Sequence, residues 1–204
     1  MRAELNSVPM SSSFNILRKT ITRFTPFPEE DWEMLLSHLQ IKTLKKHDLF
    51  AQEGKRANEV AVVFEGMLRQ FYLNDGEEKT TYFYFENHLM GAYISCLTGK
   101  PSDITIEALS DCTLIVFPYD KVNQLFAESL AWQKFCRYLA EYLAMGLEER
   151  MAGLLMLTPE ERYRDLIAGN KTKILERIPQ HYVANYLGIT PVSLSRIRNR
   201  VHKK

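Results

Sequence analysis

The strongest constraint on the fold is a hydrophobic pattern that changes twice along the chain. From Ile41 to Phe117 the apolar residues form short, partly alternating runs typical of β-strands, and on both sides of this block they follow helical spacing. Residues 60–64 are predicted to be a buried strand, and Asn74-Asp75-Gly76 is a strong hairpin signal. Several short strands with turn signals between them indicate a sandwich or a barrel. The chain is therefore predicted to be an α+β protein with helices flanking its β-domain.

A helical region over residues 14–40 precedes the β block. Pro28 is followed by three acidic residues, which indicates a helix start because carboxylates are stabilised at the positive end of the helix dipole. Residues 1–13 are expected to form a flexible, loosely ordered N-terminus.

A short helix over 119–125 and a long helix from about Leu130 to Leu157 are predicted after the β block. Apolar residues recur along one side of the long helix (Phe135, Leu139, Tyr142, Leu143, Gly146, Leu147, Leu154 and Leu155). Such a long helix carries more apolar surface than one neighbour can cover, so it is expected to self-associate. The alternative is that this side packs only on its own β-domain. Thr158 and Glu161 then form a capping-box pattern, which places a domain boundary at residue 158.

The C-terminal segment has the residue order of two short helices joined by a tight turn. Pro179 suits a first helical turn, and Gly188 can end that helix in a left-handed conformation. Thr190 can cap the second helix, with Pro191 at its first position. The predicted buried positions are Val183, Ala184 and Leu187 in the first helix and Leu194, Ile197 and Val201 in the second. This order predicts a helix-turn-helix, whose second helix enters the major groove of DNA.

The same segment concentrates positive charge. Residues 177–204 contain six lysines and arginines and no acidic residue, which gives a net charge of +6 with histidines neutral. The whole chain has a net charge of +1, from 26 basic and 25 acidic residues, so residues 1–176 are at −5. A near-neutral protein with such a short basic module usually presents it to a polyanion.

The open side of the second helix offers groups that suit DNA. Arg196 is expected to contact base edges, because an arginine can bind guanine through two hydrogen bonds, while Arg198 and Arg200 are expected to contact phosphates. The predicted DNA-binding residues are Thr190, Val192, Ser193, Ser195, Arg196, Arg198, Asn199, Arg200 and Lys203. Two alternatives remain open, a solvated basic helix and a basic tail that binds a protein partner.

The order of these elements resembles the catabolite-activator and FNR (Crp/Fnr) family of bacterial transcription regulators. The resemblance extends from about Phe14 to Arg200, and its most specific piece lies in residues 183–197. It implies an N-terminal double-stranded β-helix, also called a β-roll or jelly-roll, that senses an effector. It also implies a homodimer paired through the long helix, with double-stranded DNA as partner and RNA polymerase as a further candidate partner. The implied divisions are a flexible N-terminus (1–13), a cyclic-nucleotide-binding-like domain (14–129), a dimerisation helix (130–157) and a DNA-binding domain (158–204).

The sequence departs from this family where the effector would bind. The family's cyclic-nucleotide cassette carries a glutamate for the ribose and an arginine for the phosphate, and neither has a match here. The matching positions form the candidate effector pocket: Gly91, Ala92, Tyr93, Ser102 and Asp103. Asp103 would lie near the phosphate and repel it. Cyclic AMP is therefore not expected in the usual pose, binding of a cyclic nucleotide in a non-standard pocket stays open, and the effector is unidentified.

Other function classes find little support. Cys96, Cys112 and Cys136 are widely spaced, so neither a disulfide framework nor a metal cluster is predicted. His47 and His88 are possible haem ligands, but a lone histidine near a turn is more often solvated or hydrogen-bonded. No nucleophile–base motif or phosphate-binding glycine loop appears, so an enzyme is not expected, and no metal or cofactor is predicted.

Two further expectations concern the ends of the chain. No secretory signal and no membrane-spanning stretch is visible, which predicts a cytoplasmic protein. Family members commonly follow the second helix with a β-hairpin wing, whereas four residues follow Arg200 here, so a helix-turn-helix without an obvious wing is expected.

Overall fold

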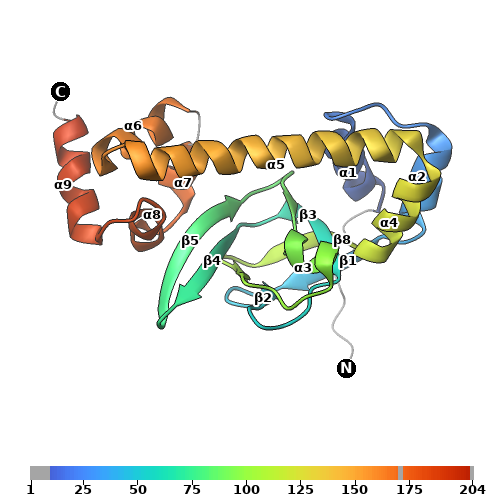
Figure 1. Ribbon diagram of the computed structural model, residues 1–204, viewed down its shortest axis with the longest axis horizontal. Coiled ribbons are helices and arrows are strands. Elements are labelled where there is room, and N and C mark those ends of the chain that lie inside the picture. The colour runs from blue at the N-terminus through green and yellow to red at the C-terminus, as the bar shows by residue number, and fades with distance from the viewer. Residues whose placement is uncertain (1–9, 170–171, 203–204) are drawn as a thin grey trace. The chain divides into compact units, whose positions relative to one another are not determined.

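The computed structural model describes residues 10–169 and 172–202 of the chain (Figure 1). Helices α1 (Met10–Thr22) and α2 (Glu29–Leu36) come first. Pro28 is the N-cap of α2, as its sequence predicts. Helix α1 begins at Met10, inside the segment for which the sequence predicts loose order. Leu17 and Ile21, one helical turn apart, are fully buried and anchor the helix. Extending an existing helix towards its N-terminus costs little free energy, because no new helix nucleus has to form.

The β block forms two four-stranded sheets that confirm the predicted α+β class with a jelly-roll-like domain. The first sheet has the order β1-β8-β3-β6, and the second has the order β2-β7-β4-β5. The strands are β1 (Gln40–Leu44), β2 (Leu49–Ala51), β3 (Glu59–Glu65), β4 (Leu68–Asn74), β5 (Glu77–Tyr84), β6 (Leu89–Met90), β7 (Thr105–Ala108) and β8 (Cys112–Pro118). Helix α3 (Tyr93–Thr98) follows β6, and α4 (Tyr119–Glu128) follows β8.

Strand β8 organises the first sheet. It pairs antiparallel with β1, from Gln40 opposite Val116 to Leu44 opposite Cys112, and on its other side with β3. The inward side chains of the strands form a core that is almost free of charge, in which Val63, Leu68 and Ile106 are completely buried. Burial of this apolar surface is the main stabilising contribution to the β-domain.

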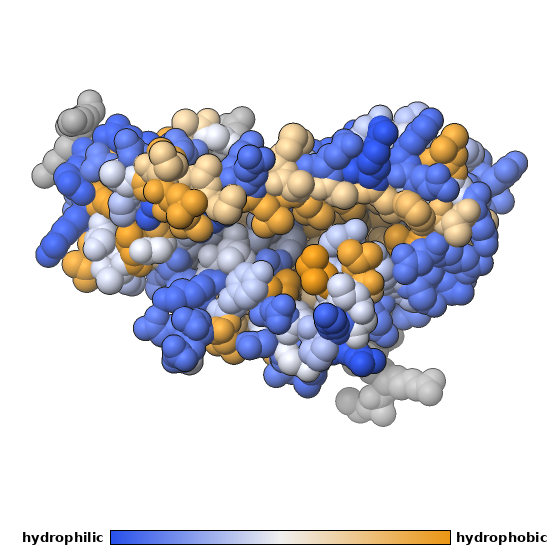
Figure 2. All heavy atoms as spheres, in the orientation of Figure 1, coloured by the Kyte–Doolittle hydropathy of each residue, from blue (hydrophilic) through white to orange (hydrophobic). Residues whose placement is uncertain are grey.

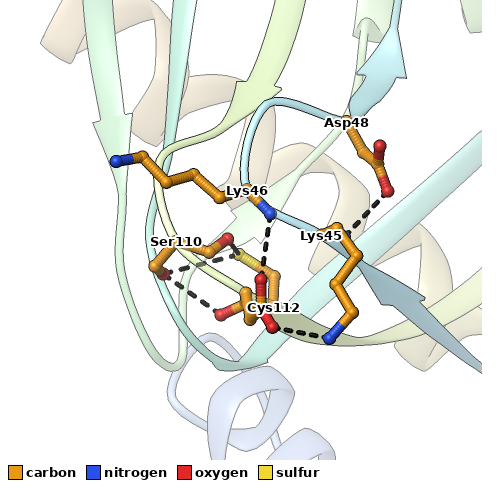
Figure 3. A network of polar contacts seen from close by, with 6 residues as sticks. Lys45, Lys46, Asp48, Ser110 and Cys112 are labelled. Atoms are coloured by element: carbon orange, nitrogen blue, oxygen red, sulfur yellow. Dashed lines mark hydrogen bonds and ion pairs between the residues drawn. The ribbon is translucent and has the colours of Figure 1, made fainter.

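Two turns of the β-domain have the geometry that their residues predict. Asp75 and Gly76 have φ angles of 52° and 80°, so the hairpin between β4 and β5 closes through two left-handed residues. Figure 3 shows the polar contacts that join the turn after β1 to the turn before β8. There the Lys45 ammonium and the Lys46 backbone N–H donate to the Asp111 carboxylate at 2.7 and 3.0 Å. These hydrogen bonds, the Lys45 side chain first, lower the pKa of Asp111.

The long helix α5 (Leu130–Met156) has the extent that the sequence predicts, to within a residue. It is followed by α6 (Pro159–Ala168), α7 (Thr172–Arg177), α8 (Gln180–Tyr186) and α9 (Pro191–His202). The capping box of α6 is present, because the Thr158 hydroxyl accepts from the Glu161 N–H while the Glu161 carboxylate accepts from the Thr158 N–H. Helix α7 is not predicted from the sequence, because its six residues are too few to show a helical apolar period.

The chain divides into two compact units. The first, here the β-roll unit, contains residues up to Arg69 together with Tyr84–Ala140, and the second, the C-terminal unit, contains Gln70–Phe83 together with the chain from Glu141 onwards. This division differs from the expected boundaries at residues 130 and 158. Helix α5 contributes to both units, and the hairpin of β4 and β5 belongs with the C-terminal helices because it contacts α8.

Aromatic packing holds the start of α5 in the β-roll unit. Trp132 and Phe135 are buried, and the Phe27 ring meets the Trp132 ring edge-on with centroids 5.0 Å apart. Beyond Ala140 the helix exposes many of its large apolar side chains, and Figure 2 shows apolar residues gathered along it. Within the described ranges, no helix is both long enough and apolar enough to cross a membrane.

Candidate nucleic-acid interface

Helices α8 and α9 form a pair with a tight turn between them. Val183, Ala184 and Leu187 of α8 are completely buried, and Leu194 and Ile197 of α9 are almost so. These five positions are predicted to be buried by the helical spacing, whereas Val201, which has the same prediction, is only half-buried. Ala184 has no exposed surface, so a larger side chain at this position would have to displace its neighbours.

The turn is built by a glycine and a capping threonine. Gly188 has a φ angle of 70°, the left-handed conformation expected there. The Thr190 hydroxyl accepts a hydrogen bond from the Ser193 backbone N–H at 3.2 Å, and Pro191 is the first residue of α9. Local sequence therefore fixes both ends of the turn.

The side of α9 that faces away from α8 is open. Val192 keeps 62% of its surface exposed, and Ser195, Arg196 and Asn199 are exposed as well, whereas Ser193 is half-buried. An exposed valine among serine, arginine and asparagine offers apolar contact for a thymine methyl next to hydrogen-bonding groups for base edges. The structure thus places the predicted base-contacting residues together on one side of one helix.

The three arginines of α9 differ in their surroundings. Arg198 donates to the Gln180 side chain at 2.9 Å, and Arg200 lies 3.3 Å from the carboxylate of Glu160, which also pairs with Arg164. Among the residues that the structure describes, Arg196 has no such partner. The Arg196 guanidinium can therefore bind a ligand without first breaking a contact within the protein, unlike those of Arg198 and Arg200. Lys203, also predicted to contact DNA, lies outside the described residues.

A contact that the sequence did not predict holds the other side of α8. The Asn185 side chain accepts a hydrogen bond from the Thr80 backbone N–H at 2.6 Å and donates one to the Glu78 carbonyl at 2.7 Å. Thr80 and Glu78 belong to β5, in the part of the hairpin that lies in the C-terminal unit. No local pattern could indicate this contact, because its partners are more than 100 residues apart in the chain.

Two arginines close the C-terminal end of α8. Arg150 of α5 donates to the Tyr186 carbonyl and lies over the Tyr186 ring, 3.9 Å from its centroid. Arg162 of α6 donates to the Leu187 carbonyl at 2.9 Å. Cations are stabilised at this end of a helix, where the carbonyls have no partner within the helix. Burial lowers the pKa of Arg150.

The candidate effector pocket lies in the β-roll unit, around the start of α3. A Cβ on Gly91 would come within 2.9 Å of the Val60 side chain, so the backbone runs close against β3 here. Ala92 is completely buried, and the Tyr93 ring meets the Tyr119 ring edge-on. Ser102 is buried too, but its hydroxyl accepts from the Ile104 N–H and donates to the Ile104 carbonyl.

Charged side chains of both signs belong to this unit. Asp103 is exposed, and the Ser102 hydroxyl is committed to its own turn. The buried arginine of this unit, Arg69, is bound to Glu107 at 2.6 Å, and Glu107 in turn lies 2.7 Å from the His47 ring. The Arg69 charge is thus paired with that of Glu107. Two other cations lie beside the segment with exposed side chains: Lys55, whose carbonyl accepts from the Ser102 N–H, and Arg56, which bridges to Pro101.

Metal and thiol chemistry gain no support from the geometry. In the described part of the chain, no three histidine, cysteine or acidic side chains come together as metal ligands would. The thiols of Cys96, Cys112 and Cys136 are all free, and burial raises the pKa of each. A raised pKa keeps a thiol protonated and poorly nucleophilic.

Comparison with known proteins agrees with this architecture. Residues 41–129 match the family model of the cyclic nucleotide-binding domain. FnrA, a transcriptional activator protein of Stutzerimonas stutzeri, is 23% identical over 173 residues, which cover 78% of this chain and 69% of FnrA.

Solved structures resemble most of the chain. FixK2 from Bradyrhizobium japonicum has a TM-score of 0.67 at 19% identity, with 81% of this chain and 85% of FixK2 covered. A structure assigned to the Crp/Fnr family, from Eubacterium rectale, also has a TM-score of 0.67, at 18% identity, with 86% and 84% covered. At these identities the likeness concerns the fold.

Proposed function

We propose, from the similarity of this chain to FnrA, FixK2 and a Crp/Fnr-type regulator, that it is a homodimeric transcription regulator that binds a specific double-stranded DNA sequence through α9. The observation that carries the proposal is the open side of α9, where Val192, Ser195, Arg196 and Asn199 stand exposed beside one another. In this assignment Arg196 contacts base edges. Arg198 and Arg200 contact phosphates after giving up their present partners, and Lys203 adds a third phosphate contact.

A dimer would give the DNA site its symmetry. Exposed apolar residues of α5, among them Leu143, Leu147 and Leu154, support pairing of this helix with its copy in a second protomer. Two copies of α9 related by a two-fold axis would occupy successive major grooves about 34 Å apart. The site is then a near-palindrome whose half-sites are one helical turn apart.

The β-roll unit would act as the sensor, with an effector that is not cyclic AMP in its usual pose. The Ser102 hydroxyl, which is bonded within its own turn, and the exposed Asp103 support this, because they stand where the family's cassette offers an arginine to the cyclic phosphate. Calorimetry with cyclic AMP and cyclic GMP tests it. Tight binding of either nucleotide would favour a non-standard pocket instead.

Binding-site selection from random double-stranded DNA, followed by fluorescence anisotropy on the selected sequence, tests the main proposal. The Arg196→Ala variant is expected to lose discrimination at one base pair of each half-site, worth about 1–3 kcal/mol per site. The matched control is Arg200→Ala, which removes the same charge from the same helix. It should weaken binding to all sequences alike and lower the slope of log affinity against log salt by about 1 per protomer.

The experiments distinguish DNA binding by the protein from base contact by Arg196. An unchanged sequence preference in Arg196→Ala would refute the assignment of this residue while leaving DNA binding intact. If the protein bound no DNA in a salt-sensitive manner, the basic segment would instead serve a protein partner.

A further inference from the structure

Strand β5 is the last strand of its sheet, so one edge of it has no strand partner among the described residues. The N–H and C=O groups along such an edge must find other partners or remain solvated. Residues two apart in a strand direct these groups to the same side, so the Thr80 N–H and the Glu78 carbonyl share one edge. Both are bound by Asn185 of α8.

The Asn185 side chain takes the place of a neighbouring strand at this edge. A carboxamide has the same acceptor and donor as a peptide group, and here its oxygen accepts from Thr80 while its nitrogen donates to Glu78. An N–H can only donate and a carbonyl can only accept, so this pairing fixes the orientation of the carboxamide. Aspartate, serine or threonine at this position would lack an N–H for Glu78.

Aromatic contacts strengthen the same junction. The rings of Phe83 on β5 and Tyr186 on α8 have centroids 5.4 Å apart, and both side chains are buried. The Arg150 guanidinium covers Tyr186 as well. Burial, followed by the neighbouring phenols of Tyr142 and Tyr186, raises the pKa of Tyr82 to about 12. The hairpin is thus fixed to α8 by two hydrogen bonds and by packed rings.

We propose that this junction, with Asn185 at its centre, positions the DNA-contacting helix, and that the hairpin of β4 and β5 thereby controls the affinity for DNA. This rests on the proposed function of α9. Helices α8 and α9 contact one another, and Val183 and Ala184 of α8 are completely buried, so a hairpin that holds α8 also restricts α9. Asn185 is a positioning residue and makes no contact with DNA in this proposal.

In this proposal, the arrangement in which α8 is bound to the hairpin is the one that binds DNA. Asn185 and Tyr186 engage the hairpin at the C-terminal end of α8, and the residues expected to contact bases stay exposed on α9 while they do so. A protein whose competent state is only partly populated binds with an affinity reduced by that fraction. Loss of the junction therefore weakens binding without changing which sequence is preferred.

The hairpin is also well placed to receive a signal. Residues 69 and 70, and residues 83 and 84, are joined by peptide bonds across the division between the two units. Arg69, at the start of β4, is held by Glu107 of β7 inside the β-roll unit. A shift of these strands on effector binding would reach the Asn185 junction through the backbone alone.

Two measurements on the full-length protein test the proposal. In Asn185→Ala the Thr80 amide is expected to exchange its hydrogen faster, as followed by NMR. Affinity for the selected DNA should fall about tenfold, which corresponds to about 1.4 kcal/mol. Sequence preference and salt slope should not change.

A second variant, Phe83→Leu, alters the junction from the hairpin side. It should weaken binding in the same way, and it tests the proposal if Asn185→Ala does not fold. Glu77→Gln is the matched control, because this exposed side chain lies on the same hairpin but outside the junction, and its affinity should stay within about twofold of wild type.

Each outcome has a distinct meaning. Faster Thr80 exchange with unchanged or tighter DNA binding would overturn the proposal, because the junction would then not define the competent state. A changed sequence preference or salt slope in Asn185→Ala would also overturn it, since Asn185 would then contact DNA directly. If wild type bound no DNA, the proposed function and this proposal would fall together, even with a protected Thr80 amide.

Discussion

Gly66 shows how one residue fixes the bend between β3 and β4. Its φ angle is 99°, and a Cβ at this position would lie 2.6 Å from both the Asp111 carbonyl oxygen and the Cys112 sulfur. Gly66→Ala therefore combines a left-handed alanine with a clash against backbone that cannot easily move. We expect the free energy of unfolding of the β-roll unit to fall by about 2–4 kcal/mol. Urea titration followed by the fluorescence of Trp32 and Trp132, both buried in this unit, measures it.

Gly54 is the matched control for this substitution. It also has a left-handed φ angle, 76°, but a Cβ there would meet nothing within 4 Å. Gly54→Ala should therefore show only the conformational cost of about 1 kcal/mol. Equal losses in the two variants would mean that the close approach at Gly66 contributes nothing.

At the scale of single elements, the start of α6 depends on the pair Thr158 and Glu161. Thr158→Ala removes the hydroxyl that accepts from the Glu161 N–H, and we expect it to destabilise this helix start by about 1 kcal/mol. Hydrogen exchange of the α6 amides reports the loss. An α6 that exchanges no faster in the variant would show that packing alone defines where the helix begins.

The same pair makes this helix start sensitive to acid. Hydrogen bonds from the Thr158 backbone and then from its hydroxyl lower the pKa of Glu161. A carboxyl whose pKa is lowered on folding contributes stability above its unfolded pKa and loses it as the pH falls through the folded pKa. The carboxyl carbon shift of Glu161 should thus titrate below the ordinary glutamate range in wild type. In Thr158→Ala the midpoint should move only part of the way back, since the backbone donor remains.

Elements with strong local signals could be predicted from the sequence, and those without them could not. Thr158 and Thr190 indicate helix starts because their hydroxyls accept from backbone N–H groups of the following turn, and Gly188 indicates a helix end through its left-handed conformation. Helix α7 is not predicted, because its six residues are too few to show a helical period. The exposed side of α9 could be predicted from helical period alone. The Asn185 junction could not, because it exists only once the fold brings β5 to α8.

At the scale of the whole molecule, the chain distributes its charge unequally. Residues 177–204 carry a net charge of +6 and residues 1–176 a net charge of −5, so the C-terminal segment is the part of the chain that a polyanion attracts most. The two units are joined by α5 and by both strands of the β4–β5 hairpin. The β-roll unit therefore has three backbone connections to the C-terminal unit, which contains α8 and α9.

A DNA site with two-fold symmetry requires a dimer, and we expect this dimer to form through α5. Leu143, Leu147, Met151 and Leu154 are spaced by four, four and three residues, so they lie along one side of the helix, and Leu147 keeps 71% of its surface exposed. Leu147→Glu would place a charge in the middle of the apolar interface of the dimer. Sedimentation should then detect a monomer, and the affinity for the full site should drop by at least about 100-fold, to that of a single half-site.

Glu148→Gln, one residue further along and off that side of α5, should leave both the mass in solution and the affinity unchanged. A dimer that survives Leu147→Glu would place the pairing surface elsewhere. A monomer that keeps full affinity would instead separate dimer formation from DNA binding, because one protomer would then account for the whole site. Only the loss of both properties together is consistent with two copies of α9 held at the spacing of one DNA turn by the paired α5 helices.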